Sequence, residues 1–151
     1  MVVLEPGCGM GFFTLELARR VGASGRVVAV DLQPQMLAGL KRRATRARLL
    51  DRLDVRVAEN DRLGVSDLSG QVGFALAFYV VHELPNPAGF FIEMQDALGQ
   101  DGVLLIVEPK AHGGGEPGFQ TTLDLAARAG LAVRDRPTFK RNQVALLGQA
   151  G

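Results

Sequence analysis

Short apolar runs alternate with stretches of helical periodicity along most of this chain, and this alternation constrains the fold more than any other feature. The runs are typical of strands, while the stretches between them place apolar residues three or four positions apart. Near-continuous apolar strands are typical of parallel sheets that helices cover on both faces. The expected strands span residues 2–4, 26–30, 53–58, 74–81 and 103–107.

The stretches between these strands predict helices with one apolar face each. Pro34 and the pair Asn86-Pro87 mark two helix starts, because proline suits a first helical turn and asparagine caps one. Residues 60–71 read as a loop with a short helix, and residues 110–118 as a glycine-rich loop. The core positions of the helices are Phe13, Leu17, Ala18, Val21, Met36, Leu40, Ala44, Phe91, Met94, Leu98, Phe119, Leu123 and Ala126.

The end of the chain follows a different pattern. Residues 131–133 and 144–147 predict two strands, and only a short stretch around Pro137 separates them. A parallel crossover needs a dozen or more residues, so these strands should pair antiparallel. The expected fold class is α/β, a Rossmann-like doubly wound sheet that is mostly parallel with a C-terminal antiparallel β-hairpin.

Composition excludes several classes of function. The 151 residues carry a formal net charge of +1, which gives no strong field for nucleic acid. No apolar run is long enough to span a bilayer. A single cysteine excludes an intramolecular disulfide and a multi-cysteine metal site, which suits a cytoplasmic protein without a metal. We expect a small-molecule partner.

A glycine-rich segment, EPGCGMG at residues 5–11, follows the first strand and opens onto a helix. Its glycines permit a sharp turn and close approach of a ligand to the backbone, and the free N–H groups of the helix favour electron-rich atoms. A purely structural turn is the alternative interpretation.

Two acids favour a ligand. Asp31 ends the second strand, where such folds bind ribose hydroxyls, although it is also placed to cap the next helix. Glu5 ends the first strand, where its carboxylate would face the pyrophosphate of a dinucleotide. A ligand without phosphate that carries positive charge suits that position better.

These segments resemble the ordered motifs of class I S-adenosylmethionine-dependent methyltransferases. VLEPGCGMG at residues 3–11 is similar to their glycine motif, VAVD at 28–31 to their second motif, and AEND at 58–61 to the acidic loop that follows strand three. FYVVHELP at 78–85 resembles the strand-four motif of the ubiquinone/menaquinone-biosynthesis-type branch, and residues 98–102 and 106–110 resemble its later turn and fifth strand. The resemblance covers nearly the whole chain.

The resemblance implies S-adenosylmethionine as cofactor, S-adenosylhomocysteine as product and an unidentified small molecule as methyl acceptor. Glu5 and the glycine backbone should hold the methionine moiety, Asp31 the ribose and Glu59 the adenine amino group, with Leu32 packing nearby. The implied cofactor-binding residues are Glu5, Gly7, Cys8, Gly9, Gly11, Asp31, Leu32, Glu59 and Asn60. Tyr79 and His82 should line the methyl-transfer side as the implied catalytic residues.

Some of these side chains admit two interpretations. Cys8 is better read as a small loop residue than as a nucleophile, because no histidine partner lies in its motif. His82 is either a general base or a hydrogen-bonded wall residue, while Tyr79 should pack or orient the cofactor. His112 should be solvated. The basic run at residues 41–43 is read as a solvated helix face rather than an RNA-binding patch.

We expect residues 1–151 to form a single methyltransferase core domain that lacks the cover helices usual before the first strand of this family. Such a core would leave an apolar rim at Phe12, Phe13 and Tyr79, which favours a homodimer or another partner. Two alternatives stay open. One is a truncated, non-catalytic module that binds cofactor or a partner. The other is an NAD-dependent oxidoreductase, against which Glu5 and the terminal hairpin argue.

Overall fold

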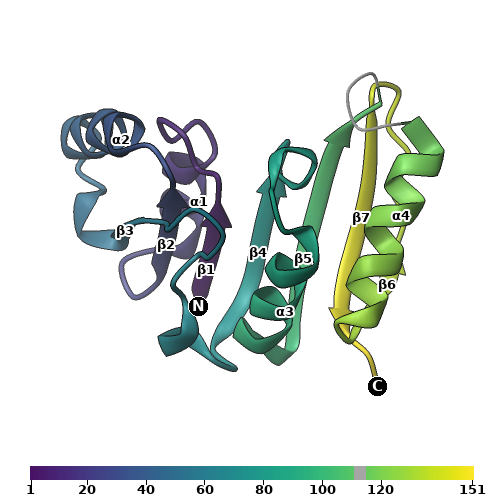
Figure 1. Cartoon of the computed structure of the whole chain (residues 1–151). Helices are drawn as coiled ribbons and strands as arrows, with labels where there is room; N and C mark the ends of the chain where they lie inside the picture. Colours follow the sequence, from purple (N-terminus) through teal and green to yellow (C-terminus); the bar gives the residue numbers. More distant parts are fainter. Residues whose placement is uncertain (111–114) are drawn as a thin grey trace.

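A computed structural model describes residues 1–110 and 115–151, without the side chains of residues 115–117. Within these residues, seven strands form one sheet in the order β3-β2-β1-β4-β5-β7-β6 (Figure 1). The strands are β1 (Val2–Pro6), β2 (Arg26–Asp31), β3 (Leu53–Val57), β4 (Val72–Phe78), β5 (Leu98–Pro109), β6 (Leu131–Asp135) and β7 (Asn142–Gln149). Strands β1 to β5 run parallel, and β7 runs antiparallel to both β5 and β6. The predicted Rossmann-like sheet with its C-terminal hairpin is confirmed.

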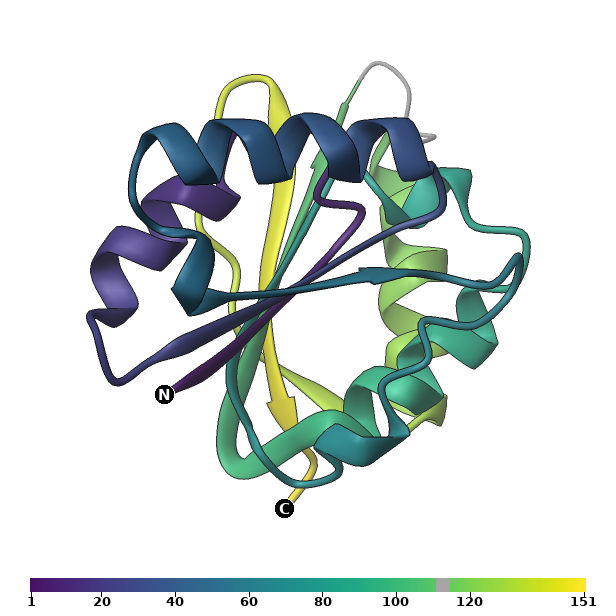
Figure 2. The same ribbon diagram turned by 90° about the vertical axis from the view of Figure 1, so that its left-hand side faces the viewer.

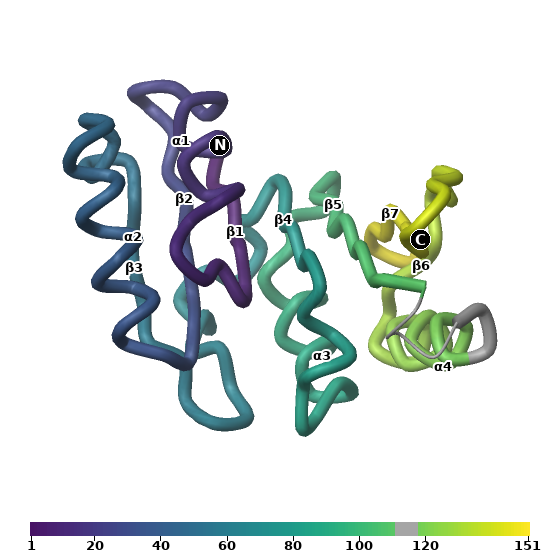
Figure 3. The backbone as a smooth tube through the Cα atoms, turned by 90° about the horizontal axis from the view of Figure 1, so that it is seen from above, coloured from purple at the N-terminus to yellow at the C-terminus, as the bar shows by residue number. Residues whose placement is uncertain are grey.

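Four helices cover the sheet in the described part of the chain: α1 (Thr14–Val21), α2 (Pro34–Arg46), α3 (Pro87–Ala97) and α4 (Gly115–Arg128). Figure 2 looks across the twisted strands, with α1 on one side and α3 and α4 on the other. The view from above in Figure 3 shows the same division. None of the described helices is long and apolar enough to cross a membrane.

The alternation of side chains along each strand builds two hydrophobic cores, one on each face of the sheet. Leu4, Val28 and Ile106 point toward α3 and α4, where they pack with Phe91 and Phe119. Val3, Val27 and Ala29 point the other way and pack against α1 and α2. Because Glu5 follows Leu4, its side chain lies on the face that α1 and α2 cover, below the glycine loop.

The fourth strand ends earlier than its apolar sequence predicts. Strand β4 stops at Phe78, and Tyr79 follows with a positive φ of 58°. Val81–Glu83 then form a 3₁₀ turn, from which Val81 still reaches the core. The prediction of a strand to residue 81 was therefore wrong. An apolar residue in a turn can be buried in the core just as a strand residue is, and the sequence alone does not distinguish the two. The predicted cap is confirmed, since the Asn86 side chain accepts a 3.0 Å hydrogen bond from the Gly89 N–H.

The chain reverses its direction of travel across the sheet at β1, which lies between β2 and β4. In open α/β sheets, ligands bind beyond the carboxyl ends of the strands at such a reversal. The glycine loop and the segments that follow β2, β3 and β4 all emerge at this edge, toward which the arrowheads of β1 and β4 point in Figure 1.

Candidate active site

The glycine loop is fixed against the end of β2. The N–H groups of Gly7 and Cys8 both donate to the Val30 carbonyl, at 2.7 and 3.1 Å. Gly7 has a φ of 71°, and a Cβ on it would lie only 2.4 Å from a methyl group of Val80. Glycine at this position therefore permits both the turn and the close approach of the segment after β4.

Asp31 bridges two segments of the site. Its Oδ2 accepts a 2.9 Å hydrogen bond from the Gly9 N–H, and its Oδ1 accepts one of 3.0 Å from the Gln33 N–H at the start of α2. Gly9 has a φ of 57°, and a Cβ on it would meet no atom within 4 Å, so the space beside its Cα is open. The carboxylate is half-buried and connects the glycine loop to the turn before α2.

Glu5 is a buried acid directly beneath the loop. Only 3% of its surface is exposed, and its Oε1 accepts a hydrogen bond from the hydroxyl of Thr14, the first residue of α1. Burial raises the pKa of Glu5 to about 7, against the lowering effect of the Thr14 hydrogen bond and with a further rise from the Asp31 charge. A cation bound beside it would favour the ionised form.

Cys8 contributes its backbone to the loop and its side chain to the core. The side chain is buried and packs in the same cluster as Leu15 and Leu40. Burial, together with the charges of Glu5 and Asp31, raises the pKa of the Cys8 thiol far above its usual range. A thiol that stays protonated is a poor nucleophile. This geometry supports the interpretation of Cys8 as a small loop residue.

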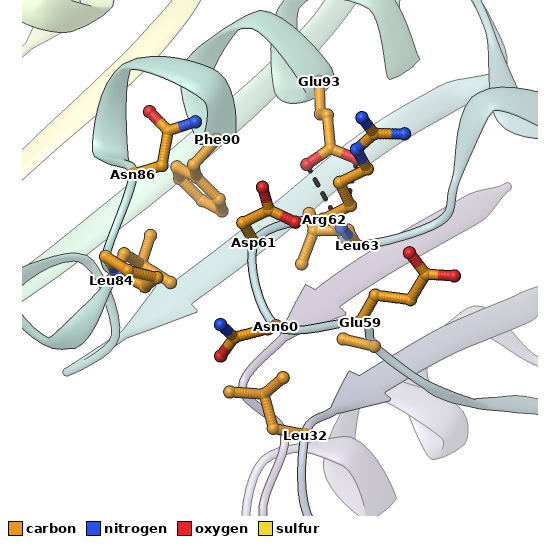
Figure 4. Close-up of a pocket in the computed structure, with 12 residues that line it drawn as sticks. Leu32, Glu59, Asn60, Asp61, Arg62, Leu63, Leu84, Asn86, Phe90 and Glu93 are labelled. Atoms are coloured by element: carbon orange, nitrogen blue, oxygen red, sulfur yellow. Dashed lines mark hydrogen bonds between the residues drawn. The ribbon is translucent and has the colours of Figure 1, made fainter.

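A hollow beside the end of β3 lies between Leu32, the loop after β3 and the start of α3 (Figure 4). Leu32 is 48% exposed and lies at its rim next to Asn60. Figure 4 shows the Asp61 carboxylate directed toward the hollow, whereas the Glu59 carboxylate points away from it. Glu59 and Asp61 both line the hollow, and Asp61 is the one whose carboxylate is directed into it.

Aromatic rings connect the glycine loop to the end of β4. The ring centroids of Phe13 and Phe78 lie 4.6 Å apart, and Tyr79 stacks on Phe78 at 4.1 Å. The Tyr79 hydroxyl donates a 2.6 Å hydrogen bond to Oδ1 of Asn142, at the start of β7. Its hydroxyl and its ring are therefore both held by neighbouring side chains.

His82 is held by Glu108, near the end of β5. The Glu108 carboxylate is 2% exposed, and its Oε1 accepts a 2.9 Å hydrogen bond from the His82 backbone N–H. Its Oε2 lies 2.6 Å from Nδ1 of the His82 ring. Nε2 lies 3.6 Å from the exposed carboxylate of Glu83, which is longer than a hydrogen bond. Glu108 thus fixes the ring from one side.

Sequence reasoning missed four of these residues. Asp61 and Glu108 stood inside segments that already resembled family motifs, at the carboxyl ends of parallel strands, so a signal for them existed. Thr14 and Asn142 carried no signal, because their partners depend on the packing of α1 and on the register of β7. The predicted residue His112 lies outside the described residues, and no cluster of potential metal ligands occurs within them.

Comparison with known proteins assigns the class that this fold and site define. The sequence profile of the family described as "Methyltransferase domain" matches residues 4–106, about two thirds of the chain. The chain therefore belongs to this family, and it is an S-adenosylmethionine-dependent methyltransferase of class I. The comparisons favour neither an NAD-dependent oxidoreductase nor a non-catalytic module.

Particular relatives agree with this assignment. The protein named catechol O-methyltransferase from Mycobacterium tuberculosis is 29% identical over 153 residues, which cover 99% of this chain and 67% of that protein. A solved S-adenosylmethionine-dependent methyltransferase from Aquifex aeolicus has a TM-score of 0.83 at 22% identity, over 100% of this chain and 82% of its own. The O-methyltransferase NcsB1 was solved with S-adenosylmethionine and 2-hydroxy-5-methyl naphthoic acid. It has a TM-score of 0.75 at 23% identity, and the match covers 98% of this chain and 48% of NcsB1.

Proposed function

We propose that this chain transfers the methyl group of S-adenosylmethionine to a small-molecule acceptor at the carboxyl edge of β1, β2, β4 and β5. The observation that carries this proposal is the pair of carboxylates around the glycine loop. Glu5 lies buried beneath the loop, and Asp31 lies beside the open space at Gly9. This arrangement suits a ligand with positive charge at one end and a ribose at the other.

The cofactor fits these residues moiety by moiety. Glu5 and the loop backbone from Gly7 to Gly11 would hold the methionine end, where the ammonium and sulfonium gain from a nearby carboxylate. Asp31 would accept hydrogen bonds from the ribose hydroxyls. The adenine would occupy the hollow beside Leu32 and Asn60, where an exposed leucine would gain an apolar partner.

S-adenosylmethionine supplies an already activated methyl group, so the protein has mainly to align the acceptor and exclude water. Tyr79 and His82 follow β4 directly and are proposed to line the methyl-transfer side. The fixed Tyr79 side chain, bonded to Asn142, would form part of the wall that orients the acceptor. His82 would either accept a proton or shape the same wall.

The finer assignment that we propose is the ubiquinone/menaquinone-biosynthesis-type branch. Its support is the segment from Phe78 to Pro85, which places an aromatic pair at the end of strand four and a histidine shortly after it. Two of the relatives point to a related chemistry, since one is named for catechol and the other is solved with a hydroxylated naphthoic acid. A ring-bearing acceptor is consistent with the aromatic rings at this edge.

Binding calorimetry tests the proposal. We expect S-adenosylhomocysteine to bind more tightly than NAD, because Glu5 favours a cationic ligand and would face the pyrophosphate of a dinucleotide. A matched pair of variants locates the site: Asp31→Asn should weaken binding, whereas Asp51→Asn, on an exposed 3₁₀ turn, should not. Tighter binding of NAD than of S-adenosylhomocysteine would refute the proposal.

We also propose the molecular setting of this activity: residues 1–151 act as one core domain, in the cytoplasm, and pair as a homodimer. Phe12 is 78% exposed and Phe139 52% exposed. An apolar hollow of about 440 Å³ lies between α1 and the β6–β7 connection, with Phe74 and Leu105 on its floor. Covering such a surface is favourable. Sedimentation velocity would show a dimer, and a monomer at high protein concentration would contradict it.

A further inference from the structure

Thr14 and Glu5 meet where three segments of the chain come together beneath the glycine loop. Glu5 lies in β1, and Thr14 begins α1. The loop lies directly over this contact, because a Cβ on Gly11 would come within 3.6 Å of Cβ of Thr14. The Leu15 N–H donates a 3.3 Å hydrogen bond to the Gly11 carbonyl, which fastens the loop to the first turn of α1. The contact between Thr14 and Glu5 is therefore part of the floor of the loop.

The two carboxylate oxygens of Glu5 have different surroundings. Oε1 accepts the hydrogen bond from the Thr14 hydroxyl, whereas Oε2 makes no hydrogen bond with a described residue. No side-chain nitrogen or oxygen in the described part of the chain is both unpartnered and fully enclosed. Oε2 therefore keeps part of the 3% of Glu5 that is exposed, and it is the oxygen that a ligand can reach.

The surroundings of Glu5 oppose its ionisation, with one exception. The ionisable groups that face it are Asp31, at the end of β2, and the Cys8 thiol in the loop. Burial and the charge of Asp31 raise the pKa of Glu5, while the thiol stays protonated and carries no charge. The Thr14 hydroxyl acts in the opposite direction, because it donates to the carboxylate. The hydroxyl is thus the group that favours the charged form before a cation binds.

We infer that Thr14 is a positioning residue of the cofactor site: its hydroxyl holds Oε1 of Glu5 in place and leaves Oε2 to receive the ammonium of the methionine moiety. This inference rests on the proposed function. An ammonium donates hydrogen bonds and accepts none, so an ionised oxygen without another partner receives it best. Without the hydroxyl, the carboxylate would lose the partner of its charged form, and the neutral carboxyl would persist to higher pH. Thr14 therefore acts on the ligand through Glu5.

Calorimetry with S-adenosylhomocysteine at two pH values tests this role. Thr14→Val removes the hydroxyl but keeps the shape of the side chain. Loss of a hydrogen bond to a charged group should move the pKa of Glu5 from about 7 to about 8. Since the ammonium binds the ionised form, we expect the variant to bind about eightfold more weakly at pH 6.5 and less than about twofold more weakly at pH 8.5. A residue that supports only the fold would lower the affinity by the same factor at both pH values.

Three controls separate the hydroxyl from its surroundings. Thr14→Ser keeps the hydroxyl, so its affinity should stay within about twofold of that of the unaltered protein. Thr45→Val removes an exposed hydroxyl that donates to the Lys41 carbonyl on α2, and it should change the affinity by less than about twofold. The ligand 5′-methylthioadenosine keeps the adenosine and the thioether but lacks the ammonium. Thr14→Val should therefore change the binding of this ligand by less than about twofold at either pH.

A measurement without cofactor reads the ionisation of Glu5 directly. Glu5→Gln assigns its signal in a ¹³C spectrum of the glutamate carboxyl groups. The titration midpoint of that signal should rise from about pH 7 to about pH 8 in Thr14→Val. Thr14→Ala removes the same hydroxyl and should raise the midpoint as well, so the comparison does not depend on the folding of one variant. An unchanged midpoint would overturn the inference whether or not the cofactor binds.

The remaining outcomes separate this inference from the proposed function. Unaltered protein that binds neither S-adenosylhomocysteine nor 5′-methylthioadenosine would refute the proposed function itself. Equal losses for the two ligands in Thr14→Val would overturn the positioning role instead. A loss in Thr14→Ser as large as in Thr14→Val would do the same, because the hydroxyl would then not be its cause.

Discussion

The buried acid beneath the glycine loop, Glu5, makes the stability of the protein depend on pH. Burial raises the pKa of Glu5 to about 7 in the folded protein, from 4.5 in an unperturbed carboxyl. Between these values the folded state binds more protons than the unfolded state, so stability falls as pH rises through this window. We expect the ligand-free protein to lose up to about 3 kcal/mol of unfolding free energy from this group between pH 4.5 and 7. Urea unfolding at several pH values measures the slope, and Glu5→Gln should remove it.

The same carboxyl should make cofactor affinity depend on pH in the opposite sense. A ligand ammonium interacts favourably with the ionised form of Glu5, and a pKa of about 7 leaves this form scarce at pH 6. We expect S-adenosylhomocysteine to bind about eightfold more tightly at pH 7.5 than at pH 6. Calorimetry across this range measures the change. A slope of equal size in Glu5→Gln would contradict the assignment of Glu5 to the methionine end.

Asp31 has a structural task as well as a proposed ligand. Its carboxylate accepts hydrogen bonds from the N–H groups of Gly9 and Gln33. We therefore expect Asp31→Ala to cost about 1–2 kcal/mol of unfolding free energy and about 1–3 kcal/mol of cofactor binding. Denaturant unfolding and calorimetry separate the two effects. If stability fell while affinity stayed constant, Asp31 would be a turn residue alone.

At the scale of an element, the loop after β3 presents two acids in different directions. Asp61 points into the hollow, whereas Glu59 points away from it (Figure 4). We expect Asp61→Asn to weaken S-adenosylhomocysteine binding about three- to tenfold, because one hydrogen bond to an ionised group contributes roughly 1 kcal/mol or more. Glu59→Gln is the matched control and should change it less than about twofold. The reverse order in calorimetry would make Glu59 the adenine contact, as the resemblance implies.

At the scale of the whole molecule, the core between the sheet and α3 should dominate stability. Phe91 is fully buried in that core, whereas its neighbour Ile92 is 61% exposed on the same helix. We expect Phe91→Ala to cost about 3–5 kcal/mol of unfolding free energy, because it removes apolar contacts and leaves a cavity. Ile92→Ala should cost less than about 0.5–1 kcal/mol. Similar losses in urea unfolding for the two variants would contradict this division.

The order of strands and helices was predictable, because burial imposes a period of two or about 3.6 on sequence wherever an element forms. That local period located β1, β2, β3, β5 and the terminal hairpin to within a few residues, except that β5 begins at Leu98 instead of residue 103. The glycine loop with Glu5 and Asp31 could be located in the same way, because each of these residues lies at the end of its own strand.

The tertiary structure alone decided the contacts between groups that are far apart in sequence. Tyr79 meets Asn142 across 63 residues because β7 pairs antiparallel with β5 in one register. His82 meets Glu108 across 26 residues because β4 stops at Phe78 and the chain turns over the end of β5. Neither the register nor the turn follows from a local period, since both depend on how strands pack side by side. The sequence by itself therefore determines the class of fold and the position of the glycine loop, and packing determines the partners of the residues that we propose to face the acceptor.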